Sequence, residues 1–429
     1  MQLPQLYEIF QRYPLISTDS RNCPSNALFF ALKGDKFDGN HYIKQVLNSG
    51  VAFAVGDCAD LPKDERIIQV DNVLQTLQDL ANYHRKQMKV QVIAVTGTNG
   101  KTTTKELIAK ALSSKYVTLF TQGNLNNHIG VPLTLLQLKP EHEFAVVEMG
   151  ANHQGEIRTL CRIAEPDFGL ITNVGRAHLE GFGSFEGVVR AKTELYDFLR
   201  EKGGIVFGNL DNPFLQDFYP SLSMVYYGAN PQAEIHGHIT ACAPTLALEW
   251  DKGNTKHSVT THLVGSYNFE NVLAAICMAD YFGVESALIN RAIQNYLPGN
   301  NRSQNHKTVK NDLILDAYNA NPCSMQAALD NFARLDGFPK MVILGEMREL
   351  GDYSYEEHQR LIDKLSILPL EQIFLVGENF NNLAVNPKWK VFAHTDALAA
   401  YLQTSGLEGY HILIKGSRNN QLEKLIPYL

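Results

Sequence analysis

The stretch Ala94-Val-Thr-Gly-Thr-Asn-Gly-Lys-Thr-Thr-Thr104 decides the fold, because it joins an apolar run to an amphipathic one through a glycine-containing turn. The run Val90–Thr96 predicts a buried strand, and Lys105–Leu112 predicts a helix. A strand that turns into a helix in this way points backbone N–H groups and the helix N-terminus at phosphate oxygens. Lys101 adds a positive charge and Thr102 offers a hydroxyl to Mg²⁺, so the stretch predicts nucleotide binding.

The loop departs from the strict pattern G-x-x-x-x-G-K-[ST], which requires glycine at position 95, where this chain has valine. What stands instead is T-G-T-N-G-K-T-T. The alternative, an ordinary turn with a surface lysine, explains neither the preceding strand nor the following helix. The expected nucleotide contacts are Gly97, Thr98, Asn99, Gly100, Lys101, Thr102 and Thr103.

Outward from the loop, short aliphatic runs alternate with longer amphipathic stretches, which predicts α/β architecture with largely parallel sheets. The runs are continuously apolar, as in strands covered by helices on both faces. Beyond Val90–Thr96, the clearest are Phe144–Glu148, Gly169–Thr172, Gly204–Phe207, Leu313–Leu315, Met341–Leu344, Ile373–Val376 and His411–Ile414.

Two discontinuities divide the chain. A self-contained α/β stretch ends in a predicted helix, Leu74–Met88, and a connection rich in Pro, Gly and Asn begins at Leu297. The sequence therefore predicts three domains, 1–88, 89–302 and 303–429.

Composition excludes several classes of protein. The 429 residues are 45% hydrophobic and 19% charged, which is typical of a folded globular chain. A net charge of -7 argues against binding nucleic acid or an anionic membrane through bulk charge. The chain has neither a signal-like start nor an apolar stretch long enough to span a membrane, so we expect a cytoplasmic protein without membrane insertion. Its six cysteines are scattered, which predicts neither disulfides nor a zinc site.

Two residues after predicted strands are candidate metal ligands. Glu148 ends one strand and His178 lies in the loop after another, at the edge where open α/β sheets bind ligands. A carboxylate and a neutral imidazole can complete the shell of a divalent ion. Each residue alone is more often structural, but their order after a phosphate loop favours the metal.

Further polar residues suit the nucleotide. Asn268 and Asn271 are three apart and share a helical face, where they can read the adenine edge or cap the helix. Arg302 lies in the connection between the second and third domains and can reach phosphates. Lys192, read alone, is a solvated helical lysine.

The T-G-T-N-G-K-T-T loop, followed in order by Glu148, His178 and Ala191-Lys-Thr-Glu-Leu195, resembles the Mur ligase family of bacterial cell-wall synthesis. The resemblance implies a three-domain architecture with a central P-loop-type sheet and a Rossmann-like C-terminal domain, and ATP and Mg²⁺ as cofactors. It also implies that Thr102, Glu148, His178 and a carbamylated Lys192 hold metal, and that Asp316 contacts the nucleotide ribose. Lys101, Lys192 and His178 are the implied catalytic residues.

Thr18-Asp-Ser-Arg21 resembles the UDP-sugar-binding domain that the tripeptide-forming and pentapeptide-forming members of the family share. Four further segments resemble the members that add a dipeptide: Asn124–Pro132, Asp316–Met325, Leu344–Gly351 and Leu413–Arg418. The resemblance implies UDP-N-acetylmuramoyl-tripeptide and D-alanyl-D-alanine as substrates, bound in part by the first and third domains. It implies substrate contacts at Asp19, Ser20, Arg21, Asn127, Asn319 and Asn321.

The first hypothesis is therefore an ATP-dependent ligase, most simply a monomer, that forms an amide through an acyl phosphate. Another Mur-type or folylpolyglutamate-type ligase is the second. A P-loop ATPase or kinase without a ligation step is the third, and a non-catalytic nucleotide sensor is the fourth. The third residue of the tripeptide, lysine or diaminopimelate, is left open.

Overall fold

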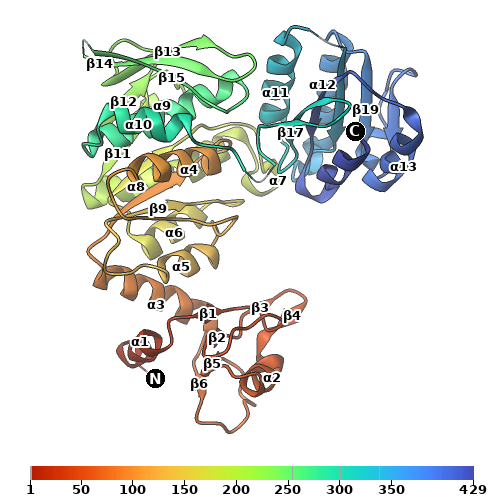
Figure 1. The fold of residues 1–429 in the computed structure, drawn as a ribbon. Coiled ribbons are helices and arrows are strands. Elements are labelled where there is room, and N and C mark those ends of the chain that lie inside the picture. Colours follow the sequence, from red (N-terminus) through yellow and green to blue (C-terminus); the bar gives the residue numbers. More distant parts are fainter. Residues whose placement is uncertain (1, 254, 300, 338) are drawn as a thin grey trace.

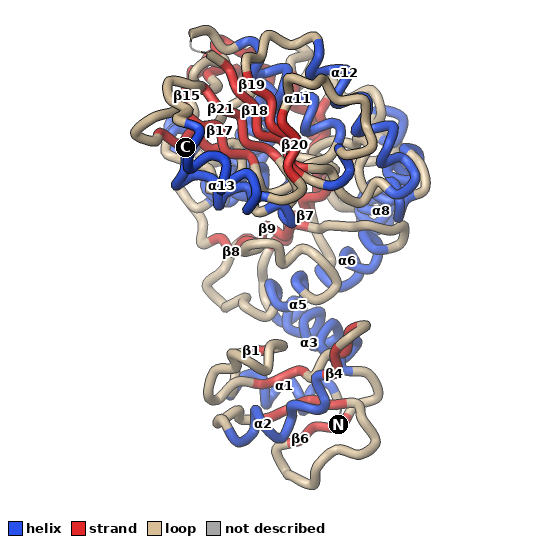
Figure 2. The backbone as a smooth tube through the Cα atoms, turned by 90° about the vertical axis from the view of Figure 1, so that its right-hand side faces the viewer, coloured by secondary structure: helices blue, strands red, loops and turns tan. Residues whose placement is uncertain are grey.

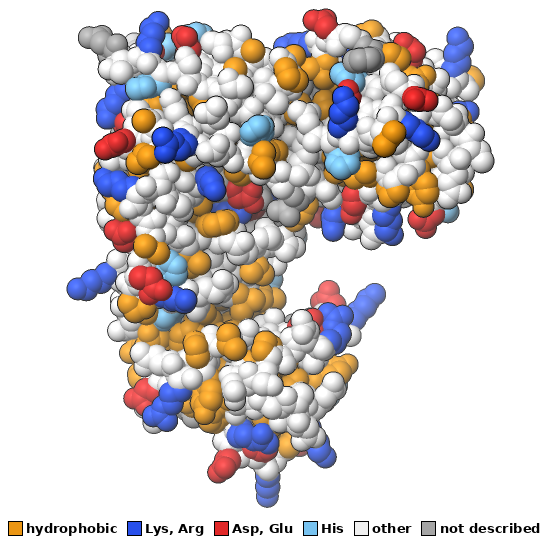
Figure 3. Space-filling view, viewed as in Figure 1, with side chains coloured by type: hydrophobic (Ala, Val, Ile, Leu, Met, Phe, Trp, Pro, Cys, Tyr) orange, Lys and Arg blue, Asp and Glu red, His pale blue; other side chains and the backbone are white. Residues whose placement is uncertain are grey.

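The protein, described here by a computed structural model, contains three main β-sheets that follow one another along the chain (Figure 1). The structure describes residues 2–253, 255–299, 301–337 and 339–429. We call the parts built around these sheets the first, central and C-terminal units. Figure 3 shows an open hollow between the first and C-terminal units, which both join the central one. The predicted boundaries after residues 88 and 302 stay predictions.

The first unit has a parallel four-stranded sheet in the order β1-β2-β5-β6 and a small β3-β4 hairpin. Its strands are short, and helices cover them. The strands are β1 (Ile16–Ser17), β2 (Leu28–Phe30), β3 (Lys33–Gly34), β4 (Phe37–Asp38), β5 (Phe53–Gly56) and β6 (Ile67–Gln69). The helices are α1 (Leu3–Arg12), α2 (Ile43–Asn48) and α3 (Val73–Gln87).

The central unit has a nine-stranded sheet in the order β15-β14-β13-β12-β11-β10-β7-β9-β8. Its strands are β7 (Gln91–Thr96), β8 (Thr118–Phe120), β9 (Phe144–Glu148), β10 (Phe168–Ile171), β11 (Ile205–Asn209), β12 (Ser223–Gly228), β13 (Ile235–Ala241), β14 (Ala247–Lys252) and β15 (Thr255–Thr260). Its helices are α4 (Lys101–Leu112), α5 (Gly130–Leu135), α6 (Glu156–Ala164), α7 (Leu179–Phe182), α8 (Phe185–Lys202), α9 (Phe269–Tyr281) and α10 (Ser286–Gln294).

The C-terminal unit has a six-stranded sheet in the order β16-β17-β21-β18-β19-β20, parallel except for β16 at one edge. The strands are β16 (Gln304–Lys307), β17 (Asp312–Asp316), β18 (Lys340–Gly345), β19 (Gln372–Val376), β20 (Lys390–Phe392) and β21 (His411–Lys415). Helices α11 (Pro322–Arg334), α12 (Ser354–Ser366) and α13 (Thr395–Ser405) accompany them. This mostly parallel α/β fold confirms the predicted fold class.

The start of helix α4 corrects one prediction. The helix begins at Lys101, four residues before the predicted Lys105, and Thr104 N–H already bonds to the carbonyl of Gly100 at 2.8 Å. Residues 101–104 are all polar, so the hydrophobic periodicity used to predict helices does not extend over them. The first turn of the helix was therefore not predicted. The antiparallel strands β13, β14 and β15 at one sheet edge were also not among the predicted strands.

Helix α3 joins the first and central units through one continuous apolar cluster. Leu77, Leu80 and Ala81 are buried in a cluster that extends from Leu6 in α1 to Leu160 in α6. Figure 2 shows α3 between the first unit and helices α5 and α6. Among the described residues, no helix has both the length and the apolarity needed to cross a membrane.

Candidate active site

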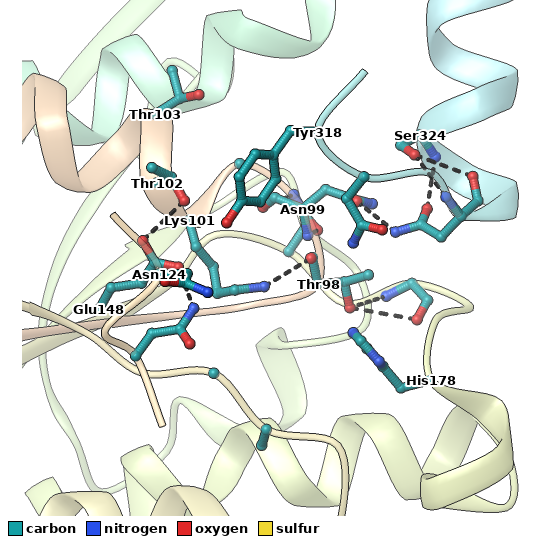
Figure 4. A pocket seen from close by; sticks show the side chains of 18 of the residues that line it. Thr98, Asn99, Lys101, Thr102, Thr103, Asn124, Glu148, His178, Tyr318 and Ser324 are labelled. Atoms are coloured by element: carbon teal, nitrogen blue, oxygen red, sulfur yellow. Dashed lines mark hydrogen bonds between the residues drawn. The ribbon is translucent and has the colours of Figure 1, made fainter. Parts of the chain in front are cut away.

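A cavity of about 1050 Å³ lies where strands β7, β9 and β10 end, and the C-terminal unit supplies part of its wall. This is the edge at which open α/β sheets bind ligands. Figure 4 shows the phosphate-loop side chains, Glu148, His178 and Tyr318 gathered around it. The predicted residues that line it are Thr98, Asn99, Gly100, Lys101, Thr102, Thr103, Asn127, Glu148, His178, Asn268, Asn271, Arg302, Asp316, Asn319 and Asn321.

Two glycines give the phosphate loop its shape. Gly97 has φ +141°, and a Cβ there would stand 2.0 Å from the hydroxyl oxygen of Thr172. Gly100 has φ +77°, and a Cβ would stand 2.5 Å from the side-chain oxygen of Asn271. Both positions therefore require glycine, for backbone conformation and for space. Gly97 does not line the cavity and acts as the bend behind it.

Lys101 lies along the inside of the loop. Its ammonium donates to the carbonyl oxygen of Gly97 at 2.8 Å and to that of Thr98 at 3.0 Å. Figure 4 shows Lys101 beside Thr98. Burial lowers the pKa of Lys101, and nearby Arg302 lowers it further, while Glu148 and Glu349 oppose the shift. An ammonium has three donors, and the loop carbonyls use two of them. The third donor and the positive charge stay available for a phosphate.

Glu148 is a buried carboxylate held by neutral donors. It is only 2% exposed, and it accepts hydrogen bonds from the Thr102 hydroxyl at 2.9 Å and the Asn126 amide at 2.8 Å. The described part of the chain offers it no ion pair. Both hydrogen-bond donors to this buried charge are neutral, so burying it remains costly, which favours a bound cation beside it.

His178 connects the central and C-terminal units. It precedes helix α7 with φ +52°, and its Nδ1 pairs with a carboxylate oxygen of Glu349 from the loop after β18. The hydrogen bond from His178 is the main reason that the pKa of Glu349 is lowered. The histidine thus lies in the cavity at the junction of two sheets.

The two asparagines lie at the start of helix α9, where Asn268 is the N-cap residue but its side chain makes no capping hydrogen bond to this fully described helix. The Asn271 amide nitrogen donates to the Asn268 side-chain oxygen at 3.0 Å, and the Asn271 oxygen accepts from Thr104 at 3.0 Å. The Asn268 amide donates to the Val264 carbonyl at 2.8 Å. The bond from Thr104 braces α9 against α4 beside the cavity, and the other two fix the start of α9.

Arg302 and Asp316 form the wall near the connection between units. The Arg302 guanidinium stacks 3.8 Å from the ring centre of Tyr318, and its buried Nε finds no hydrogen-bond partner among the described residues. Asp316 pairs with Lys415 at 2.5 Å and accepts from the Ser303 N–H at 3.4 Å. An arginine with an unused buried donor is suited to an anion.

The remaining asparagines shape the loops of the cavity. Asn127 accepts from the N–H groups of Ile129 and Gly130 at 3.1 and 2.9 Å, at the start of α5. Asn321 caps helix α11 and donates to the Asn99 side-chain oxygen at 2.7 Å, which links the C-terminal unit to the phosphate loop. Asn319 is exposed.

Lys192 is not the solvated lysine that its position on a helix suggests. It is 2% exposed, lies 3.5 Å from the carbonyl oxygen of Ala151, and does not line the cavity. Burial, with a smaller contribution from Lys101, lowers the pKa of Lys192 to about 7. An amine with this pKa is neutral in a large fraction of molecules at physiological pH.

Asp19, Ser20 and Arg21 lie in the first unit, outside the cavity. Asp19 accepts two side-chain hydrogen bonds from Arg21 at 2.9 Å, which lower the pKa of Asp19 to about 2. Ser20 is buried.

Sequence reasoning did not predict several polar residues that line the cavity, and four of them make contacts with predicted residues. Each of these four lies in or beside a motif that the sequence analysis recognised. The sequence does not show which side chains of a motif face the cavity, because the fold decides this. Tyr318 and Lys415 adjoin the ends of β17 and β21, and Asn126 and Glu349 fall within segments that carry the family resemblance.

The residues present suit Mg²⁺. Among the described residues, no group of three or more His, Cys, Asp and Glu side chains could hold a metal. Mg²⁺ does not need one, because it keeps several waters and is commonly held by one or two carboxylates together with phosphate oxygens. The buried Glu148 and the Thr102 hydroxyl provide such a partial shell.

Comparison with known proteins gives matches along nearly the whole chain. Residues 12–85 match the family description "Mur ligase family, catalytic domain", residues 95–279 match "Mur ligase middle domain", and residues 301–418 match "Mur ligase, glutamate ligase domain". Two similar relatives are UDP-N-acetylmuramoyl-tripeptide–D-alanyl-D-alanine ligases. The one from Bacillus subtilis (strain 168) is 34% identical over 96% of this chain and 92% of its own. That of Escherichia coli (strain K12) is 33% identical over 96% and 93%.

Solved structures show the same architecture. A crystal structure of MurF from Acinetobacter baumannii matches with a TM-score of 0.88 and 31% identity, covering 99% of this chain and 98% of that one. The MurF ligase of Thermotoga maritima, in complex with ADP, matches with a TM-score of 0.85 and 25% identity over 96% of each chain.

Proposed function

The chain belongs to the Mur ligase family, and on this basis we propose that it is the ATP-dependent ligase that joins D-alanyl-D-alanine to UDP-N-acetylmuramoyl-tripeptide. The observation that carries this proposal is the similarity to ligases of that name, which spans 96% of the chain. The reaction forms a C–N bond in peptidoglycan precursor synthesis and releases ADP and phosphate.

We propose that the reaction passes through an acyl phosphate. A carboxylate has no good leaving group; transfer of the γ-phosphoryl group of ATP to the tripeptide carboxylate supplies one. The dipeptide nitrogen then forms the new bond to the acyl carbon, the C–O bond to phosphate breaks, and the nitrogen loses its proton. Lys101 and Arg302 neutralise the charge that moves with the phosphoryl group, which is electrostatic stabilisation by positioned cations.

Mg²⁺ supplies charge neutralisation at the phosphates when it is bound. We propose that Thr102 contacts the ion on the phosphate-loop side and that Glu148 and His178, with a carbamate on Lys192, hold a second ion. The buried charge of Glu148 and the pKa of Lys192 near 7 support this assignment.

We assign the first unit to the UDP substrate, through Asp19, Ser20 and Arg21. The central unit holds ATP through residues 98–103, with Gly97 shaping the loop behind them and Asn268 and Asn271 toward the base. Asp316 of the C-terminal unit meets the ribose, and Asn127, Asn319 and Asn321 contact the other substrates. Because one chain supplies all these residues, we propose a monomer, acting in the cytoplasm, where ATP and nucleotide-linked precursors occur.

The decisive experiment measures phosphate release from ATP with the UDP-tripeptide and a panel of amines. Ligation predicts release only when both the acceptor and D-alanyl-D-alanine are present. Release with a free amino acid in place of the dipeptide would indicate another ligase of the family. Phosphate retained on one product would indicate a kinase, and no turnover with any pair would favour a nucleotide sensor.

A further inference from the structure

Glu349 differs from the other carboxylates that line the cavity. Two of the others are held by donors of the central unit, and the third is paired with a lysine. Glu349 pairs with the imidazole of His178, and its side chain is 53% exposed. Glu156 also pairs with an imidazole, that of His153, and is 42% exposed, but two backbone N–H groups of the central unit hold it as well. The charge of Glu349 is therefore both accessible and not paired with a lysine or arginine among the described residues. The other three carboxylates are Glu148, Glu156 and Asp316.

The fold holds Glu349 in this place. It follows strand β18, at the edge where the C-terminal sheet faces the cavity, and its φ is +61°. Two residues earlier, the Met347 N–H donates to Nε2 of the buried His358 at 3.0 Å. His358 donates through Nδ1 to the Ser354 carbonyl at 2.7 Å, so both ends of its ring are fixed. A non-glycine residue with positive φ persists only where its surroundings enforce it.

The incoming dipeptide requires a partner of this kind. At neutral pH its terminal amine is an ammonium, which carries three donors and is bound most strongly by a carboxylate. The ammonium must also lie near the phosphate loop, because the acyl phosphate forms there. Glu349 comes from the C-terminal unit, lines the same cavity as Lys101 and interacts electrostatically with it.

We propose that Glu349 binds the ammonium group of D-alanyl-D-alanine and positions its nitrogen near the acyl carbon. The ammonium then loses one proton to water, which frees the lone pair for attack, and the nitrogen loses its second proton after the C–N bond has formed. This role deepens the proposed function and rests on it. Glu349 acts in this proposal by binding the dipeptide before the C–N bond forms. The proposal thus names a side chain that binds the nucleophile, beside the residues already assigned to the phosphates.

The test compares two nucleophiles in Glu349→Gln. Hydroxylamine is uncharged at neutral pH and traps the acyl phosphate as a hydroxamate, whereas the dipeptide arrives as a cation. We expect the ratio of kcat/KM for the dipeptide to that for hydroxylamine to fall by about tenfold to a hundredfold, the range for losing a charged hydrogen bond. Glu349→Asp, which keeps the charge, should fall less. Glu180→Gln removes an exposed carboxylate of α7 outside the cavity and should leave the ratio unchanged.

Three results would overturn the inference. An unchanged KM for the dipeptide in Glu349→Gln would show that the carboxylate does not bind it. Equal losses with both nucleophiles, together with a raised Mg²⁺ requirement, would show that Glu349 acts through His178. If the wild-type protein gives neither hydroxamate nor phosphate release with the dipeptide, the proposed function itself fails. The wild-type reactions thus separate the two failures.

Discussion

At the scale of single residues, Lys101 is the most direct test of the phosphate loop. Lys101→Ala removes a cation that we assign to the transferring phosphoryl group, so we expect kcat to fall by about a hundredfold to a thousandfold. Phosphate release in the complete reaction measures it. Lys110→Ala, an exposed lysine of the same helix α4, is the control. A wild-type kcat in Lys101→Ala would contradict the assignment of the loop.

Lys192 gives a prediction that depends on pH. Only the neutral amine takes up CO₂, and the pKa of Lys192 lies near 7, below its ordinary value, so the reactive fraction increases as pH rises through 7. With CO₂ limiting, the rate should rise between about pH 6 and pH 8, and added bicarbonate should raise it further. Lys192→Arg should stay inactive because a guanidinium remains cationic. Near-normal turnover in Lys192→Arg would contradict the proposal that Lys192 carries a carbamate.

At the scale of elements, the turn between β7 and α4 depends on Gly100. Gly100→Ala places a Cβ 2.5 Å from the Asn271 side-chain oxygen and forces an L-residue into φ +77°. The left-handed backbone conformation lowers the free energy of unfolding by about 1 kcal/mol. The clash with Asn271 lowers it further and pushes α9 away from the loop. We expect a lower Tm and a higher KM for ATP.

A second glycine separates the two causes. Gly183 has φ +78°, nearly the same, but a Cβ there meets nothing within 4 Å. Gly183→Ala should therefore lower Tm by the backbone cost alone and leave the KM for ATP unchanged. Equal effects of both substitutions on Tm and KM would mean that the contact with Asn271 is unimportant.

The elements also show how far sequence reasoning reaches. Continuously apolar strands could be predicted within one or two residues, and Phe144–Glu148 to the residue, because burial on both faces leaves one pattern. The first turn of α4 could not, since its residues are polar and its start depends on the left-handed Gly100. Glu349 was beyond reach for a different reason: its contact with His178 joins residues far apart in the chain.

At the scale of the whole molecule, the assignment of the first unit predicts a separation of affinities. Asp19→Asn should raise the KM for the UDP-substrate and leave the KM for ATP unchanged, because Asp19 lies outside the cavity. Asp64→Asn is a matched control, since Asp64 pairs with Arg66 in the same way, two residues apart, and its pKa is also lowered to about 2. Equal damage to both KM values in Asp19→Asn would contradict this division.

Helix α3 makes the first unit less independent than its separate sheet suggests. Beyond the shared apolar cluster, Arg85 forms an ion pair with Asp167 at 2.8 Å, and the Gln78 amide donates to the His128 carbonyl at 3.0 Å. Loosening the first unit exposes apolar surface of α5 and α6, so we expect the first and central units to unfold together. The C-terminal unit has apolar clusters of its own and does not depend on this contact. A recombinant fragment that ends after residue 87 exposes the apolar face of α3 that α5 and α6 normally cover, so we expect it to aggregate. For the same reason, replacing the first unit by that of a relative succeeds only if the contacting surfaces of α5 and α6 are replaced with it.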